Sequence, residues 1–321
     1  MDLRIESLKF PFIGQSGLFS SGVLQEELQR RAVGAYLGVA VGDALGATTE
    51  FMTPREIEHK YGVHDKIIGG GWLHLKPGHV TDDTEMSLAL GKSILENSGV
   101  VATAAAEAFS DWMRTKPVDI GNTVRRGIVH YRNTGEPFTP ENEFDAGNGA
   151  CMRTVPIALA YWNAPIEELI SVSRTQSHVT HNNSQADAGT EAILKMTVSA
   201  LRNGASKEDL KQIADSLVAE HKPYRFDRKK AQNPSAWIVH TLKVVFQSFF
   251  NNDSFEAILI DAINRGGDAD TTGAIVGMLA GAYYGVDAIP KSWLKALKPD
   301  VRKACQKQAL DLLELAEERA A

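Results

Sequence analysis

The stretch Gly34-Ala-Tyr-Leu-Gly38-Val-Ala-Val-Gly42-Asp-Ala-Leu-Gly46 has a glycine at every fourth position of an otherwise mostly apolar segment. A second stretch, residues 273–285, repeats the pattern with glycines at 273, 277, 281 and 285. A four-residue repeat follows one face of an α-helix, where each glycine costs about 1 kcal/mol relative to alanine. We therefore expect two core helices whose glycine faces allow close backbone approach.

Both glycine-bearing segments are expected in the protein core rather than in a membrane. Small residues at this spacing are also typical of helices that dimerise in a bilayer. However, the longest uncharged apolar run, residues 273–286, is 14 residues long, whereas a membrane span needs about 20. Each segment also adjoins a group of acidic residues. We expect the two helices to lie close to each other and to those acids.

Apolar positions at helical spacing recur along the rest of the chain, and no segment alternates with the period of two that strands show. Loops are expected at residues 53–71, 133–148 and 222–234, which are rich in glycine, proline and asparagine. The sequence predicts a single compact all-α domain over residues 25–321, preceded by an irregular N-terminal extension over residues 1–24. Helices are expected over residues 25–45, 84–95, 102–113, 166–174, 186–202, 207–219, 237–250 and 301–320.

Composition and charge exclude several classes of protein. Of the 321 residues, 43% are hydrophobic and 23% are charged, which are ordinary values for a folded soluble chain. With 34 basic and 40 acidic residues, the net charge is −6, a poor match for nucleic-acid phosphates. Cys151 and Cys305 form no CxxC pair, and the first residues lack the apolar segment of a signal peptide. We expect a cytoplasmic protein that neither inserts into a membrane nor binds nucleic acid.

Two short acidic groups stand before predicted helices, Thr81-Asp82-Asp83 and Asp268-Ala269-Asp270-Thr271. Each group alone is explained by helix N-capping, because aspartate and threonine are preferred there. Together, four close carboxylates would repel one another unless a cation lay between them. Carboxylate and hydroxyl oxygens suit Mg²⁺, Mn²⁺ or Ca²⁺ rather than zinc, and EF-hand spacing is missing. The two groups therefore predict a divalent-cation site, with capping as the alternative.

Three further polar segments are candidates for a functional site. Glu50 follows the first glycine-bearing helix and would approach Asp268 if the two such helices are neighbours. Residues 147–149, Gly-Asn-Gly, precede an apolar segment. They would either offer free backbone N–H groups to an anion or form a tight turn with a glycine N-cap. Asp119, in the segment Pro-Val-Asp-Ile-Gly-Asn, is either a helix cap or a buried acid.

Two histidines and a tryptophan carry weaker signals. His178 and His181 lie three residues apart and as metal ligands would suit zinc or iron. Histidines in such positions are more often surface or capping residues. Trp237, taken alone, is expected in the core.

Four of these segments resemble the signature segments of the ADP-ribosylglycohydrolase family. They read VGDALGATTE at 41–50, TDDTEMS at 81–87, GNGACMR at 147–153 and GGDADTTG at 266–273. They occur in the family's order, and the resemblance spans about residues 28–297. Three more segments resemble a bacterial branch of the family that acts on ADP-ribosylated dinitrogenase reductase, namely residues 69–78, 117–127 and 281–287.

The resemblance implies an all-helical fold with two divalent cations, manganese in the bacterial branch and magnesium in animal relatives. It implies Asp119 and Glu50 as catalytic acids, with Asp119 against the scissile ribose and Glu50 near the metals. It also implies that His181 and Trp237 line the ADP-ribose cleft, although the residues after His181 and the tryptophan at 237 depart from the family pattern. The implied metal ligands are Thr81, Asp82, Asp83, Asp268, Asp270 and Thr271, and the implied diphosphate loop is Gly147, Asn148 and Gly149.

The activity that the resemblance implies is hydrolysis of the bond between ADP-ribose and a protein arginine. The implied target is dinitrogenase reductase, so that nitrogenase is reactivated. A PII-type nitrogen regulatory protein, and through it reversible attachment to the membrane, is a further implied partner. Three alternatives are open. The protein could act on another protein or a free ADP-ribose conjugate, bind ADP-ribose without catalysis, or block a partner's active site with its N-terminal extension.

Overall fold

The computed structural model describes residues 21–202 and 204–320. Over these residues the chain forms α-helices and two short 3₁₀ helices, with isolated bridges but no strand, which confirms the predicted all-α fold. The helices are α1 Ser21–Gly46, α2 Pro54–Tyr61, α3 Asp82–Glu96, α4 Ala102–Arg114, α5 Asn122–Thr134, α6 Val155–Ala160, α7 Ile166–Ser177, α8 Ser184–Leu201, α9 Lys207–Glu220, η1 Lys222–Tyr224, α10 Ile238–Asn251, α11 Phe255–Ile263, α12 Ala269–Tyr284, η2 Val286–Ala288, α13 Lys291–Ala296 and α14 Pro299–Ala320.

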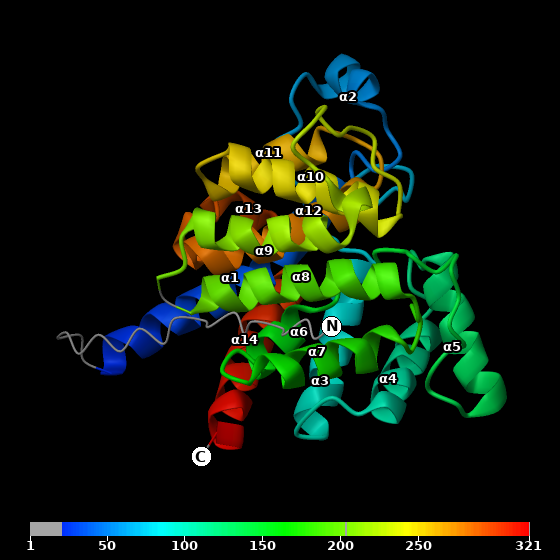
Figure 1. The fold of residues 1–321 in the computed structure, drawn as a ribbon. Coiled ribbons are helices and arrows are strands. Elements are labelled where there is room, and N and C mark those ends of the chain that lie inside the picture. Colours follow the sequence, from blue (N-terminus) through cyan, green and yellow to red (C-terminus); the bar gives the residue numbers. More distant parts are fainter. Residues whose placement is uncertain (1–20, 203, 321) are drawn as a thin grey trace, which may run out of the picture.

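Helices α1 and α12 lie at the centre of the molecule, behind α8 and α9 in the view of Figure 1. They run antiparallel with their glycine faces in contact. A Cβ atom on Gly38 would lie 2.0 Å from the carbonyl oxygen of Gly277, and one on Gly42 would lie 2.0 Å from that of Gly273. Only glycine therefore allows the two backbones to approach this closely. The predicted proximity of the two glycine-bearing helices is confirmed.

Replacing Gly38 with alanine should lower the free energy of unfolding by about 3 kcal/mol or more. The added methyl group would meet backbone atoms of α12, which cannot move aside as a flexible side chain could. Gly22→Ala is the matched control, because Gly22 lies in the same helix with nothing within 4 Å of its Cβ position. It should leave stability unchanged or raise it by up to about 1 kcal/mol. Urea unfolding of both variants measures the difference, and equal effects would contradict this account.

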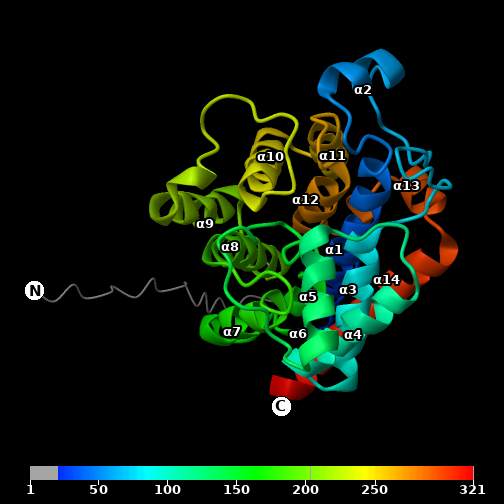
Figure 2. The same cartoon turned by 90° about the vertical axis from the view of Figure 1, so that its right-hand side faces the viewer.

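The remaining helices enclose this central pair on both sides. Helices α3 and α14 pack on α1, whereas α8, α10 and α11 pack on α12. Figure 2 shows these two groups on opposite sides of the pair. At one end, Gly46 of α1 packs on Ala269 at the start of α12, and Asp43 of α1 contacts Thr81 just before α3. The C-terminal end of α1 therefore meets the N-terminal ends of α3 and α12.

The N-terminal boundary differs from the prediction. Helix α1 begins at Ser21, so residues 21–24 are helical rather than part of an irregular extension. Residues 1–20 lie outside the described part of the chain, and the predictions for them stay predictions. Among the described residues, no helix combines the length and the apolar character needed to cross a bilayer. Cys151 and Cys305 are buried free thiols.

The predicted loop over residues 53–71 is also partly wrong, because it contains α2. Thr53 and Glu56 form a capping box at the start of this helix, in which each side chain accepts a hydrogen bond from the other residue's backbone N–H. Helix α2 buries only Ile57, so apolar periodicity does not reveal it. Helices α5 and α11 are also missed by periodicity.

Candidate metal centre and ligand cleft

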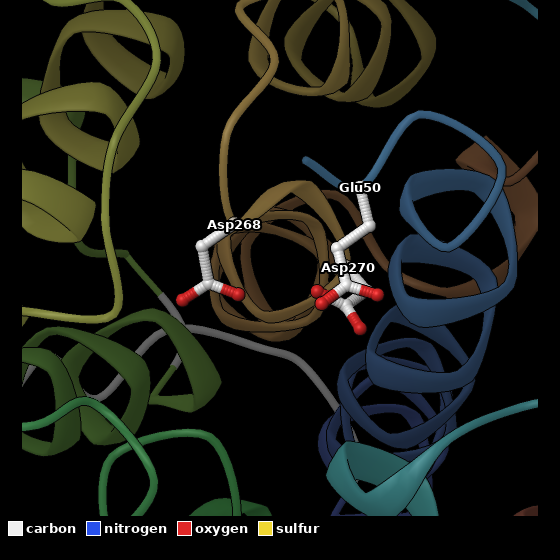
Figure 3. A group of neighbouring side chains, drawn as sticks. All are labelled: Glu50, Asp268 and Asp270. Carbon is white, nitrogen blue, oxygen red and sulfur yellow. The ribbon is translucent and has the colours of Figure 1, made fainter. Parts of the chain in front are cut away.

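The meeting of α1, α3 and α12 brings the predicted acidic residues together. One carboxylate oxygen from each of Glu50, Asp268 and Asp270 lies within 4.8 Å of the others. Figure 3 shows Glu50 extending from the chain after α1 onto Asp270, with Asp268 beside them at the start of α12. All three residues are buried. The predicted approach of Glu50 to Asp268 is confirmed.

Asp83 links the first acidic group to the second. The Thr271 hydroxyl donates to Asp83 Oδ2 at 3.4 Å, and the Thr81 hydroxyl lies 3.2 Å from the same oxygen. The other oxygen, Asp83 Oδ1, is buried and has no hydrogen-bond partner among the residues that the structure describes. A buried carboxylate oxygen without a partner is costly unless it is protonated or bound to a cation. Asp83 Oδ1 is thus available as a ligand.

The alternative explanation, that each acidic group caps the helix that follows it, does not hold. Thr81 and Asp268 occupy the N-cap positions of α3 and α12, but neither side chain makes a capping hydrogen bond. At α3 this role falls to Asp43 of α1. Its carboxylate accepts hydrogen bonds from the backbone N–H of Thr81 at 3.0 Å and from that of Thr84 at 3.2 Å. The capping is supplied from another helix, and the side chains of the acidic groups face one another instead.

Asp43 is a site residue that sequence reasoning missed. It stands within the quoted segment 41–50, but the order of residues does not show which helix its side chain reaches. The hydroxyl groups of Thr81 and Thr84 also donate to its carboxylate, at 2.9 and 2.5 Å. Burial raises the pKa of Asp43 to about 6, against the lowering effect of these hydrogen bonds. Asp43 therefore fixes the start of α3, from which Asp82 and Asp83 extend.

Burial raises the pKa of every carboxyl group in the cluster. It is the main cause for Asp82, Asp83 and Asp270, whose pKa values lie well above the ordinary range and are raised further by neighbouring carboxylates. Burial also raises the pKa of Glu50, to about 8, and it raises the pKa of Asp268. Crowded acids of this kind hold protons unless cations replace them. The all-oxygen donor set fits a hard divalent cation such as Mg²⁺ or Mn²⁺.

Without a bound cation, the protein should lose stability as the pH rises from about 5 to 8. The cluster carboxyls have raised pKa values in the folded chain, and ordinary values of about 4 in the unfolded chain. The folded state therefore binds more protons over this range, so deprotonation costs stability. An added cation should raise the melting temperature more at about pH 8 than at about pH 5.5. Melting curves in EDTA and in excess Mn²⁺ test this, and equal shifts at both pH values would contradict it.

Asp119 lies half-buried on the loop between α4 and α5. Its carboxylate accepts a hydrogen bond from the backbone N–H of Ile120 at 2.8 Å, and burial raises its pKa. Its charge contributes to the raised pKa of both Asp82 and Glu50. The N-cap of α5 is Gly121, so Asp119 is not a helix cap.

The loop Gly147-Asn148-Gly149 lies beside the second acidic group. The Asn148 side-chain amide donates to Asp268 Oδ2 at 2.5 Å and to Thr241 Oγ1 at 2.9 Å. Helix α6 begins only at Val155, so the loop does not open a helix and Gly149 is not an N-cap. Within the described part of the chain, the Gly149 backbone N–H donates to no backbone carbonyl oxygen, and Gly149 is buried against the His181 ring.

His181 is buried directly beneath this loop. Its Nδ1 lies 2.7 Å from the Thr180 hydroxyl, and its Nε2 lies 3.0 Å from the position that a Cβ on Gly147 would occupy. Burial lowers the pKa of His181 to about 3, and the charges of Arg153 and Arg126 lower it further. The imidazole is therefore neutral at physiological pH and supports the loop from below.

The other two weak candidates also differ from expectation. Trp237 is 37% exposed and donates its indole N–H to Gln185 Oε1 at 2.7 Å, so the expectation of a core residue is wrong. Its backbone pairs with Gly147 in an isolated bridge, which sets the tryptophan beside the glycine loop. His178 contacts Asp187 at 2.9 Å instead of sharing a site with His181. The two histidines thus do not form a joint metal site.

Phe51 and Trp72, called here the aromatic pair, are further residues that sequence reasoning missed. The Trp72 indole N–H donates to Glu50 Oε2 at 2.6 Å, and the two rings lie with centroids 5.3 Å apart. Trp72 stands in the glycine-rich segment 69–78, for which the family resemblance is the only signal in the sequence. No pattern in the chain shows that its side chain would reach Glu50.

The chain is similar to known proteins over most of its length. The model of the ADP-ribosylglycohydrolase family matches residues 24–321. The ADP-ribosyl-[dinitrogen reductase] glycohydrolase of Rhodospirillum rubrum is 48% identical over 286 residues, which cover 89% of this chain and 96% of the relative. The ADP-ribosylarginine hydrolase Tri1 of Serratia proteamaculans is 31% identical over 287 residues, which cover 85% and 76%.

A solved structure described as an ADP-ribosylglycohydrolase-related protein complex has the same fold. It superposes with a TM-score of 0.81 at 36% sequence identity and covers 91% of this chain and 99% of its own. Sequence and fold agree over nearly the whole described chain, and the segments that carry the acids and the glycine loop lie within the matched residues. The chain belongs to the ADP-ribosylglycohydrolase family.

Proposed function

We propose that the protein is a hydrolase that removes ADP-ribose from an arginine side chain of a target protein. The observation that carries this proposal is the convergence of buried acids from three helix ends beside a glycine loop, with Asn148 joined to Asp268. Cleavage of a glycosidic bond develops positive charge on the ribose, which carboxylates stabilise. The Rhodospirillum relative is an ADP-ribosyl-[dinitrogen reductase] glycohydrolase, and the Serratia relative is an ADP-ribosylarginine hydrolase.

The proposed cofactor is a pair of divalent cations, with Mn²⁺ ahead of Mg²⁺. The unpartnered oxygen of Asp83 and the raised pKa values of its neighbours support this assignment. Bound cations would lower the pKa of a water molecule and orient the ribose hydroxyl groups. The proposed ligands are Thr81, Asp82, Asp83, Asp268, Asp270 and Thr271.

Glu50 and Asp119 are proposed to handle the protons of the reaction. Guanidine leaves more easily once it is protonated, and the attacking water must lose a proton. Burial raises the pKa of both carboxyls, that of Glu50 to about 8, so each can exist in the protonated form that an acid requires. The Trp72 indole fixes one oxygen of Glu50. Asp119 lies outside the group formed by Glu50 with Asp268 and Asp270.

The ADP part of the substrate is proposed to bind along the glycine loop. The backbone N–H of Gly149 would donate to a diphosphate oxygen, with Asn148 holding the loop in place through its hydrogen bond to Asp268. The neutral ring of His181 supports the loop from beneath, and the partly exposed Trp237 lies beside the loop. These assignments follow the family pattern and the positions of the side chains.

The proposed target is ADP-ribosylated dinitrogenase reductase, after the Rhodospirillum relative. Incubating the protein with this substrate, with and without Mn²⁺, should release ADP-ribose only when the metal is present. Asp270→Asn is the negative control. Release from ADP-ribosylated arginine peptides alone would instead indicate another protein target. Binding of ADP-ribose without any turnover would indicate a non-catalytic member. A PII-type regulatory partner and cytoplasmic location with reversible membrane attachment stay predictions from the family resemblance.

A further inference from the structure

The aromatic pair presents two large exposed rings directly beside a buried acid. Phe51 is 64% exposed and Trp72 is 48% exposed, whereas Glu50, which Trp72 contacts, is only 5% exposed. Neither ring is required to fill the core, because so much of each faces solvent. Large aromatic side chains that remain exposed at the edge of a site are typical of ligand-binding surfaces.

The backbone at Phe51 is held in an unusual conformation that keeps the ring in this place. Its φ angle is 61°, in the left-handed region that bulky residues rarely adopt. Its N–H donates to the carbonyl oxygen of Gly267 at 2.7 Å, which ties the residue to the turn before Asp268. Glycine would adopt this conformation without strain. Folding therefore does not account for a phenylalanine here, and a role for its exposed ring does.

The chemistry around the aromatic pair selects the kind of ligand. Aromatic faces attract cations, and the carboxyl group of Glu50 lies directly against Trp72, where it can accept a hydrogen bond. A guanidinium group is planar, stacks on aromatic rings and hydrogen-bonds to carboxylates, so it matches this combination better than a compact ammonium. The proposed function supplies such a group, because the bond that breaks joins ribose to an arginine guanidinium.

We infer that the aromatic pair is the subsite for the arginine side chain of the substrate. This inference rests on the proposed function and adds the part of the site that recognises the leaving group. Phe51 supplies the stacking face. Trp72 is a positioning residue, because its indole N–H donates to Oε2 of Glu50 and so orients the carboxyl group.

Two variants separate these roles. Phe51→Leu keeps an apolar side chain of similar length but removes the aromatic face. Trp72→Phe keeps an aromatic face but removes the hydrogen bond to Glu50. Phe138→Leu is the matched control, because Phe138 is an exposed phenylalanine that packs on His178 instead. The probes are ADP-ribose, which lacks a guanidinium, and ADP-ribosylagmatine, which carries one.

Phe51→Leu should raise KM for ADP-ribosylagmatine by about 3- to 30-fold with little change in kcat, while the Kd for ADP-ribose stays the same. Trp72→Phe should lower kcat by about 10-fold or more while KM stays near the wild-type value. Phe138→Leu should change neither constant. An unchanged KM in Phe51→Leu, or an equal loss of affinity for ADP-ribose, would overturn the subsite.

Failure of the proposed function would look different, because wild-type protein with Mn²⁺ would not hydrolyse ADP-ribosylagmatine at all. In that case calorimetric Kd values for the same two ligands replace KM. Wild-type protein should still bind ADP-ribosylagmatine better than Phe51→Leu does by the same factor. Equal Kd values would exclude the guanidinium subsite independently of any catalysis.

Discussion

Asp119→Asn should lower kcat by about 10²- to 10⁴-fold, the range that general acid–base groups contribute. A carboxyl group that faces the ribose can transfer a proton and stabilise positive charge, and both effects act in the transition state more than in the ground state. Asparagine keeps the shape but does neither. Because Asp119 is not one of the six proposed metal ligands, bound Mn²⁺ and affinity for ADP-ribose should change little. The loss should therefore appear in kcat rather than in KM.

Three measurements on this variant distinguish catalysis from structure: kcat, bound manganese and melting temperature. The asparagine oxygen can still accept the hydrogen bond from Ile120, so the melting temperature should stay near the wild-type value. Asp111→Asn is a suitable control, because Asp111 is an exposed acid of α4 that pairs with Arg114 away from the cluster. Near-normal kcat with a lowered melting temperature would assign Asp119 to a structural role.

Asp270→Asn should abolish metal binding and lower the turnover rate by about 10³-fold or more, because metal-ion catalysis supplies several kcal/mol of transition-state stabilisation. Asp270 belongs to the three-carboxylate group and lies at the start of α12. The fold should persist, since α12 is held by α1, α8, α10 and α11 rather than by the metal. Metal analysis, activity and circular dichroism on one sample measure all three outcomes.

The same variant has a second expected result in the absence of metal. Repulsion from Glu50, Asp83 and Asp268 raises the pKa of Asp270 in addition to the effect of burial. An uncharged asparagine removes that repulsion, so the metal-free variant should melt at a higher temperature than the metal-free wild type at about pH 8. Mn²⁺ should stabilise the wild type and leave the variant unchanged. Global unfolding of Asp270→Asn would show instead that the acid holds the fold.

The central helices and the approach of Glu50 to Asp268 could be predicted because each glycine repeat, with the acid beside it, lies within one continuous segment of the sequence. Glycine at four-residue spacing has one physical explanation in a soluble helix, namely close packing against another backbone. The pairing of α1 with α12 then fixes which acids meet, since Glu50 follows one helix and Asp268 precedes the other.

Asp43 and Trp72 could not be predicted because each acts on a residue of a different segment. Asp43 caps a helix whose first residues lie 38 positions further along the chain, and Trp72 reaches Glu50 across 22 positions. The spacing of apolar and polar residues within one segment does not show contacts between residues so far apart in the sequence. Helix α2 is a different case, because the Thr53–Glu56 capping box is visible in the sequence and outweighs the weak apolar pattern.

The pairing of α1 with α12 also has a consequence during protein synthesis. Helix α1 ends at Gly46 and its partner begins at Ala269, so the ribosome adds about 220 residues between them, which takes roughly 10 to 45 s at ordinary synthesis rates of about 5 to 20 residues per second. During that time the glycine face of α1 has no native partner. A nascent chain that stalls before α12 therefore carries Glu50 and Asp83 but not Asp268 or Asp270. We expect activity only from chains translated through α12, because the acids of the site come from both ends of the sequence.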